Sequence, residues 1–400
     1  IVSNRENNGI GIYAKDTGSK GINTGTITME KTNAIGMYGK DVASLESSTG
    51  SNIKVKKTGS VGMYGVVSAS ATVPPFTVKN AGTIELEEGG SAGIYLVNKS
   101  TATDIIGNLS ASNTGTGTIK LKSGEGSIGI YAPKATISSV GTITMEKSTA
   151  PNSVDTTKSI AAYISDGGKI TDASTANINL GTSGSNIAYY IKDAKTSIEG
   201  TDVGTVSGRG VGVYLEGTSS TAKLTKGVAA SGGTPAVPDS PELNFTKGGN
   251  DNGDGIVGLY LKGNTDISTY EKKITVGNTV VNNNNDIIAS AIGIYSDAQG
   301  TAGTGNEYII KSNIVTGKKA VGIFSAKGAN KSYIKYEGTQ MDLGEGSTGF
   351  YVNGETELAS PTIYSAGGLI AYVTQDSTFK GGTATVNLSK PGIGVYGEKG

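Results

Sequence analysis

The chain offers few residue patterns that could carry chemistry, and the clearest is the stretch GGNDNGDG at 248–255. Asn250, Asn252 and Asp254 place oxygen ligands at alternate positions, and a glycine follows where a calcium loop makes its sharp turn. Leu261 stands where such a loop has its closing bidentate glutamate. A plain Asx or glycine turn explains the same residues. Calcium is therefore a candidate ligand, and no other cofactor is expected.

The amino-acid composition excludes most known arrangements of catalytic residues. Histidine and cysteine are absent, which excludes Ser-His-Asp triads, Cys-His pairs, disulfides and imidazole or thiolate metal ligands. Glu85, Glu87 and Glu88 cluster, but Glu85 and Glu87 alternate along one expected strand, which indicates a solvated face rather than the carboxylate pair of a glycosidase. We predict no catalytic residue and no enzyme. A polysaccharide-degrading enzyme is a remote alternative based on fold analogy.

The charge balance argues against a nucleic-acid partner. The chain has 34 Lys and Arg against 34 Asp and Glu, so its formal net charge is zero. A protein that binds phosphates usually has a basic stripe. No apolar run approaches the ~20 residues of a membrane helix, and residue 1 is Ile. We interpret the chain as a segment of a longer repetitive protein.

One short sequence phrase, xGxY, is repeated along the whole chain. The strands that it predicts must position the other residues. It reads GIGIY at 9–13, IGMY at 35–38 and VGMY at 61–64. Alignment on its aromatic residue gives fourteen copies at intervals of 21 to 46 residues. Eleven copies have glycine two positions earlier, and their aromatic residues are Tyr13, Tyr38, Tyr64, Tyr95, Tyr131, Tyr214, Tyr260, Tyr295, Phe324, Tyr351 and Tyr396. The three degenerate copies have Ala161, Ala188 or Ile370 there, before Tyr163, Tyr190 and Tyr372.

A second recurring phrase lies between many copies and reads as a turn followed by a strand. Examples are NTGTITM at 23–29, NAGTIEL at 80–86 and GTGTIKL at 115–121. A repeat of 20–50 residues indicates a solenoid, a propeller or an array. Gly, Ser, Thr, Asn and β-branched residues argue against helical repeats, and the shortest intervals are too short for a four-stranded blade. We predict an all-β fold, a right-handed parallel β-helix (β-solenoid) of about 14 rungs with loop insertions.

Alternation along a strand predicts which side chains face the core. Ile10 and Ile12 are expected to point inward, whereas Gly11 and Tyr13 share the outer face. The aromatic residues of the eleven regular copies then form a structural ladder outside the core, each ring lying beside a bare glycine. The alternative is that tyrosine simply fits a pleated surface.

The unequal spacing between successive copies of the repeat predicts which rungs carry insertions. We interpret residues 1–400 as one β-helix segment with an inserted loop at 217–255 and smaller insertions at 97–117 and 263–290. Insertions in solenoids project from one side and often build the binding face. The alternative is tolerated surface drift.

The pairing of xGxY phrases with N-x-G-T-I turns resembles the passenger regions of large monomeric (type V) autotransporter adhesins, especially the fusobacterial outer-membrane ones. The lysine- and asparagine-rich composition, with Arg5 and Arg209 as its two arginines, is similar to that group. The resemblance covers the whole chain and implies a passenger exposed on the bacterial cell surface, exported through the outer membrane by a C-terminal β-barrel absent from this sequence. No binding motif of the family maps onto individual residues here, so the ligand-binding residues are unknown.

The resemblance implies attachment by non-catalytic binding to host cells, to other bacteria in coaggregation, or to both, with a role in virulence. The expected partner is a host surface protein or glycan, or the surface of a partner bacterium, and the expected state is a monomer. The alternative function is a passive spacer that displays a distal binding tip.

Overall fold

The computed structural model describes all residues except 5–6, 70–74, 101–107, 147–156, 194–196, 228–238, 248, 250–252, 298–306, 327–331 and 399–400. The described residues form strands and turns with no α-helix. The chain folds as an all-β parallel β-helix, as predicted. It divides into two compact units, Ile1–Glu199 and Gly200–Gly400, and each is described by itself.

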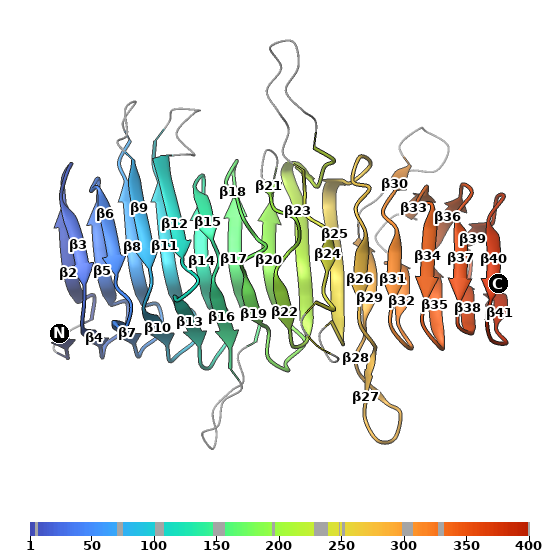
Figure 1. The fold of residues 1–400 in the computed structure, drawn as a ribbon, viewed down its shortest axis with the longest axis horizontal. Helices are drawn as coiled ribbons and strands as arrows, with labels where there is room; N and C mark the ends of the chain where they lie inside the picture. The colour runs from blue at the N-terminus through green and yellow to red at the C-terminus, as the bar shows by residue number, and fades with distance from the viewer. Residues whose placement is uncertain are drawn as a thin grey trace, which may run out of the picture. The chain divides into compact units, whose positions relative to one another are not determined.

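The first unit consists of three parallel sheets whose strands follow one another in rung order (Figure 1). The xGxY strands form the first sheet: β2 (Ile10–Lys15), β5 (Ile35–Lys40), β8 (Val61–Val67), β11 (Ala92–Asn98), β14 (Ile128–Pro133), β17 (Ile160–Ser165) and β20 (Asn186–Lys192). The second sheet contains β3 (Lys20–Asn23), β6 (Ser44–Ser47), β9 (Phe76–Asn80), β12 (Leu109–Asn113), β15 (Thr136–Ser139), β18 (Lys169–Ile170) and β21 (Ser197–Ile198). The third contains β1 (Val2–Ser3), β4 (Thr26–Met29), β7 (Asn52–Val55), β10 (Thr83–Leu86), β13 (Thr118–Leu121), β16 (Thr142–Met145) and β19 (Asn177–Asn179).

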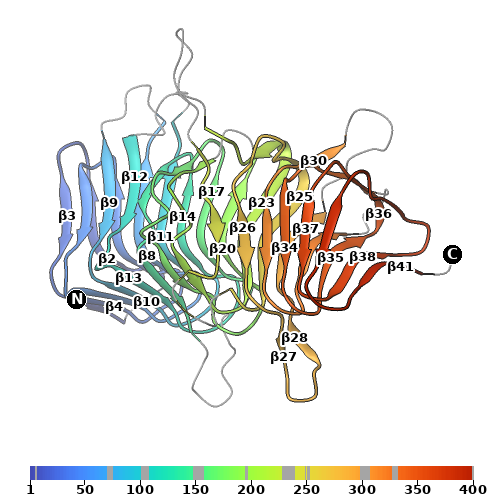
Figure 2. The same cartoon turned by 45° about the vertical axis from the view of Figure 1, so that its right-hand side comes forward.

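The second unit repeats this plan (Figure 2). It begins with the short strand β22 (Thr205–Ser207). Its xGxY strands are β23 (Gly210–Lys223), β25 (Ile256–Asp266), β29 (Ile292–Asp297), β32 (Val321–Ser325), β35 (Ser347–Val352), β38 (Gly368–Val373) and β41 (Ile393–Gly397). A second sheet holds β30 (Tyr308–Ile310), β33 (Ser332–Tyr336), β36 (Gly354–Leu358) and β39 (Thr378–Lys380). A third holds β24 (Leu243–Asn244), β26 (Ile274–Val276), β31 (Ile314–Thr316), β34 (Gln340–Leu343), β37 (Thr362–Ser365) and β40 (Thr385–Leu388).

The core is built from aliphatic side chains that recur at the same position of each rung. The strands of the third sheet of the first unit are called the T-I-x-L strands here, after TIEL in β10. Their alternation is regular, with Ile84 and Leu86 of β10 buried while Glu85 between them faces outward. Parallel pairing keeps Ile84 in register with Ile53 on one side and Ile119 on the other. Like side chains therefore stack on like along the axis, which gives the dense packing of a protein interior.

The sequence-based prediction for the glycine of the repeat is wrong. In β8, Gly62 and Met63 are both buried, whereas Val61 and Tyr64 are half-buried on the outer face. Two neighbouring positions thus face inward, and strict alternation breaks at this point. In β8 the aliphatic residue before the glycine therefore lies on the outer face, although Ala92 and Ile292 at the same position of β11 and β29 are buried. Ile10 at the start of β2 follows the same arrangement and is exposed.

Close approach explains why this position takes glycine. A Cβ on Gly62 would lie 2.6 Å from the carbonyl oxygen of Gly93 on the next rung and 2.6 Å from Cγ2 of Ile84 on the facing sheet. Both distances are shorter than real Cβ contacts, and one of the obstacles is backbone. Gly62 is not among the residues with positive φ. The requirement is thus steric space between two sheets, not a special backbone conformation.

Two of the three degenerate copies have a small residue after the altered position. Ala161 is followed by the buried Ala162, and Ile370 by the buried Ala371, where the glycine-bearing copies have Met, Ile, Val, Leu or Phe. The third copy differs, because Ala188 is followed by Tyr189, which is fully buried. The interior therefore accepts pairs of side chains of different total size at these rungs.

Candidate functional site: an outer aromatic column and projecting elements

The aromatic residues of the first unit form one column on the outer face of the xGxY sheet. Parallel register pairs Tyr95 with Tyr64 and with Tyr131. The ring centroids of Tyr95 and Tyr131 lie 4.5 Å apart with nearly parallel planes, whereas Tyr64 and Tyr95 meet edge to face at 5.3 Å. The remaining neighbours in the unit, Tyr13–Tyr38, Tyr38–Tyr64, Tyr131–Tyr163 and Tyr163–Tyr190, lie 4.8 to 5.5 Å apart. Both arrangements are favoured for aromatic pairs, each contributing ~0.5–1.5 kcal/mol beyond burial.

The second unit carries a column of the same kind, with all its pairs stacked. Tyr214 and Tyr260 lie 4.6 Å apart, as do Tyr260 and Tyr295. Phe324 continues the column in place of a tyrosine. The further pairs at 4.5 to 5.3 Å are Phe324–Tyr351, Tyr351–Tyr372 and Tyr372–Tyr396. Tyr163, Tyr190 and Tyr372, which the sequence pattern leaves out of the ladder, therefore lie within these columns.

Burial within the columns changes the acidity of the phenols. Burial, and after it the neighbouring phenols of Tyr95 and Tyr163, raises the pKa of Tyr131 to about 12. Burial also raises the pKa of Tyr64 and of Tyr260 above the ordinary value. The neutral ring is the form that fits between two other rings, because an ionised phenol loses hydration there.

A ladder of paired charges covers the outer face of the T-I-x-L sheet. The Glu85 carboxylate lies 3.6 Å from the Lys54 ammonium and 3.1 Å from that of Lys122, and Glu87 also pairs with Lys54 at 2.7 Å. Burial alone raises the pKa of Glu85, but the ammonium groups of Lys122 and Lys54 outweigh burial and hold its pKa below the ordinary value. These glutamates bind lysines of adjacent rungs, an arrangement that the sequence analysis did not find although Lys54, Glu85 and Lys120 occupy equivalent positions.

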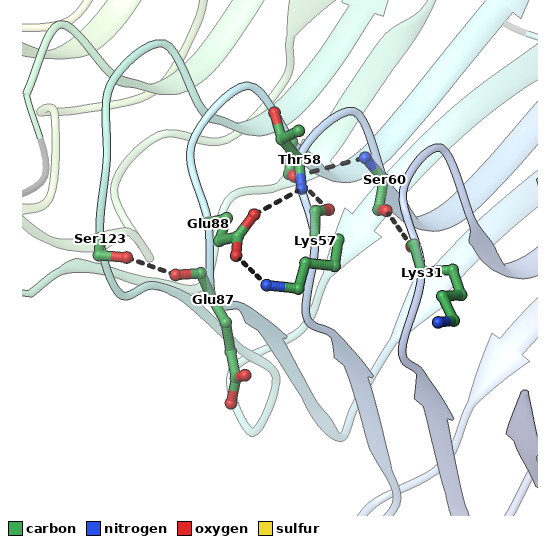
Figure 3. A network of polar contacts seen from close by, with 8 residues as sticks. Lys31, Lys57, Thr58, Ser60, Glu87, Glu88 and Ser123 are labelled. Carbon is green, nitrogen blue, oxygen red and sulfur yellow. Dashed lines mark hydrogen bonds and ion pairs between the residues drawn. The ribbon is translucent and has the colours of Figure 1, made fainter. Parts of the chain in front are cut away.

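Polar contacts at the next turn join the same rungs. Figure 3 shows Glu88 reaching back to the preceding rung, where it accepts hydrogen bonds from Lys57 Nζ and from the Thr58 backbone at 3.2 Å. Ser60 in turn donates to the Lys31 carbonyl at 3.3 Å. These contacts fix the turn that leads into the xGxY strand.

Two buried ladders of polar side chains were also missed by the sequence analysis. The first consists of hydroxyls just before the xGxY strands: Ser127 Oγ accepts from the Ser91 backbone, and Ser159 Oγ accepts from that of Ser127 at 3.1 Å. In the second, Asn80 donates to Asn113 Oδ1 at 2.8 Å. Serine or asparagine recurring at one repeat position is the signal that could have revealed them. Each ladder supplies partners to buried backbone groups at a rung corner, which would otherwise be unpaired.

The calcium candidate stays a prediction. Asn250 and Asn252 lie outside the described residues. Asp254 belongs to the turn before β25, and its carboxylate accepts hydrogen bonds from the backbone and the side chain of Asn278 at 2.5 and 3.2 Å. Its observed role is thus to join two neighbouring turns. Within the described ranges, no cluster of three or more acidic side chains could hold a metal ion.

The three predicted insertion ranges contain regular strands as well as projecting segments. Strand β12 lies within 97–117, β24 lies within 217–255, and β26 lies within 263–290. What leaves the stack in the last range is an antiparallel hairpin of β27 (Val280–Val281) and β28 (Ile287–Ala289), which projects in both ribbon views (Figures 1 and 2).

The tip of this hairpin is held by one asparagine. The Asn282 side chain donates to the Asp286 carboxylate at 2.8 Å and accepts from the backbone of Asn284 and of Asp286. Ile287 and Ile288 are 66% and 52% exposed. The hairpin is therefore an ordered projection that presents apolar side chains to solvent.

No family model, no curated protein and no solved structure matches this chain. None of the segments that the structure describes is a helix long and apolar enough to cross a membrane.

Proposed function

We propose that this chain is part of a surface-exposed autotransporter-type adhesin passenger that attaches cells by non-catalytic binding. The observation that carries the proposal is hairpin β27–β28, an ordered, apolar projection on a scaffold whose register continues past it, from β25 through β29 to β32. A β-helix that tolerates a projection without losing register is suited to display contact surfaces along its length.

The proposed partners are a host cell-surface protein or glycan, or the surface of another bacterium. Ile287 and Ile288 would supply the apolar part of a contact, since exposed apolar side chains gathered on one element often mark an interaction site. The proposed location is the outside of the bacterial outer membrane, which agrees with a chain that has no cysteine and needs no disulfide to fold.

The test measures attachment of the purified chain to host cells and to partner bacteria. A variant with Ile287→Ser and Ile288→Ser keeps Asn282 and hence the hairpin tip, and we expect it to attach less than the parent. Ile22→Ser is the matched control, because Ile22 is also exposed but lies far along the chain in β3. Equal attachment by all three proteins would remove the hairpin as a contact.

A passive spacer is the second candidate function. The regular register of each unit favours it, because uniform stacking gives length without requiring a ligand. Complete failure of the parent chain to attach to any tested cell would favour the spacer over the adhesin.

A further inference from the structure

A hollow of about 430 Å³ lies in the second unit, where the ends of two xGxY strands meet a turn. Lys223 ends β23 and Asp266 ends β25. Glu271 belongs to the turn that follows, and Lys311 follows β30. The volume is typical of sites for small molecules. The lining side chains are all charged or hydroxyl-bearing, although most of the surface that they expose to the hollow belongs to carbon atoms.

The three lysines around the hollow differ in how closely they contact a carboxylate. Lys223 lies 3.1 Å from the Asp266 carboxylate, and Lys226 lies 2.7 Å from that of Glu271. Each of these two carboxylates is therefore neutralised by its own lysine. Lys311 brings a third positive charge to the lining.

Lys311 has the weakest carboxylate contact of the three lysines. Its ammonium lies 4.0 Å from Glu337. Glu337 itself has a shorter contact, 2.9 Å, with Lys335. The Glu337 carboxylate is thus shared between two ammonium groups, so Lys311 is only partly neutralised by it and keeps capacity for an anion bound in the hollow that it lines.

The walls of the hollow are fixed by buried and half-buried hydrogen bonds. Asp266 accepts hydrogen bonds from the backbone and the hydroxyl of Ser268 at 3.0 and 2.7 Å. Tyr270, fully buried, donates to the Pro241 carbonyl at 2.6 Å. Ser312, next to Lys311, donates to the Tyr270 carbonyl at 3.3 Å. The charged groups are thus arranged before any ligand arrives, which reduces the entropic cost of binding.

We propose that this hollow binds a carboxylated sugar, a sialate or a uronate. The sugar carboxylate would contact Lys311, and the ring hydroxyls would donate to Asp266 and Glu271. The hydroxyls of Thr225 and Thr269 in the lining would supply further hydrogen bonds. A lining of this kind suits a polyhydroxylated anion, which brings one acceptor for the spare ammonium and several donors for the two carboxylates.

The inference rests on the proposed function, because it names the ligand class through which an adhesin would recognise a cell. Lys223 and Lys226 are at least half exposed and Lys311 is half-buried, so we expect a weak contact that added salt reduces further.

The experiment is ligand-observed NMR titration of the full chain with 3′-sialyllactose, glucuronate and neutral lactose. We expect at least one acidic sugar to bind and lactose to bind at least about tenfold more weakly, the factor that ~1.4 kcal/mol represents. The two acidic probes distinguish a sialate from a uronate. Lys311→Gln should lose about tenfold in affinity for the acidic sugar. Lys31→Gln, which removes the same charge from an exposed position in the other unit, should bind like the parent.

Three results would overturn the proposal: no binding of either acidic sugar, equal binding of lactose, or unchanged affinity in Lys311→Gln. Circular dichroism of both variants shows whether the fold is kept. Because the titration needs no cells, failure of sugar binding with intact attachment would remove this site and leave the adhesin proposal standing. Sugar binding without attachment to cells would leave this site standing and count against the adhesin proposal.

Discussion

At the scale of single residues, the glycine of the repeat determines how closely two sheets can approach. Its inward position follows from the neighbours that a Cβ would meet, not from backbone flexibility. The residue before it, which a regular strand would bury, lies outside next to the ring. The small size of this glycine therefore explains why residues 61–64 depart from regular alternation.

Gly62→Ala tests this explanation. We expect the added methyl to lower the free energy of unfolding by about 1–3 kcal/mol, since neither the Gly93 carbonyl nor the Ile84 side chain can easily move. Urea unfolding of the full chain, followed by circular dichroism, measures the loss. Gly25→Ala is the control, because a Cβ there has no atom within 4 Å. Equal unfolding midpoints for the two variants would contradict the steric explanation.

The sequence shows that this glycine recurs, but not which way it faces. Regular alternation places Gly62 outside with Tyr64, and the irregularity between them depends on Ile84 of a different strand. Such a contact between residues from two sheets has no local signal in either strand. By contrast, the T-I-x-L strands follow plain alternation, in agreement with the expectation that Glu85 lies on the outer face of its strand.

At the scale of elements, each aromatic column joins neighbouring strands of one sheet on their solvent side. Successive rings of the first unit lie 4.5 to 5.5 Å apart. The tyrosines of the degenerate copies belong to the columns because strand register, rather than the preceding glycine, positions each ring. The aromatic residue of the repeat alone therefore predicts the members of each column better than the full xGxY phrase does.

Alkaline pH should weaken the fold through these columns. The pKa of Tyr131 is about 12 in the folded chain against ~10 for an unperturbed tyrosine. The folded state therefore holds a proton that the unfolded state has lost, so this contribution is complete below about pH 10 and is lost as pH rises towards 12. Absorbance of phenolate and circular dichroism, recorded together from pH 8 to 13, should show late ionisation that coincides with unfolding.

Tyr131→Phe is the matched variant for this titration. It keeps the stacked ring, as Phe324 does in the second unit, but removes the ionising group. We expect a smaller loss of stability between about pH 10 and 12 than in the parent chain. Ionisation of every tyrosine near pH 10 in a chain that remains folded would contradict the assignment.

At the scale of the whole molecule, the spacing of one phrase was enough to predict the all-β parallel β-helix. Intervals of 21 to 46 residues allow a rung of three short strands, and the β-branched composition excludes helical repeats. The candidate site was far less predictable. The hollow near Lys311 combines residues from 223 to 311, and its charges become a group only when three separate segments, 223–226, 266–271 and 311, fold together.

The central claim is that residues one repeat apart are direct neighbours in parallel register. Because the chain has no cysteine, disulfide formation between two introduced cysteines tests it most directly. Glu85 and Lys120 are register partners on the outer face of the T-I-x-L sheet, with an expected Cα separation of ~4.8 Å, inside the range that a disulfide can bridge. Glu85 and Lys122 are offset by two positions, which gives roughly 8 Å.

Under mild oxidation, we predict rapid intramolecular cross-linking of the Glu85→Cys/Lys120→Cys chain and little or none of the Glu85→Cys/Lys122→Cys chain, since Cα atoms more than ~7 Å apart cannot be bridged without backbone movement. Mass spectrometry of the digested monomer identifies the bridge. Failure of the first pair to cross-link, or equal cross-linking of both, would contradict the parallel register on which the account depends.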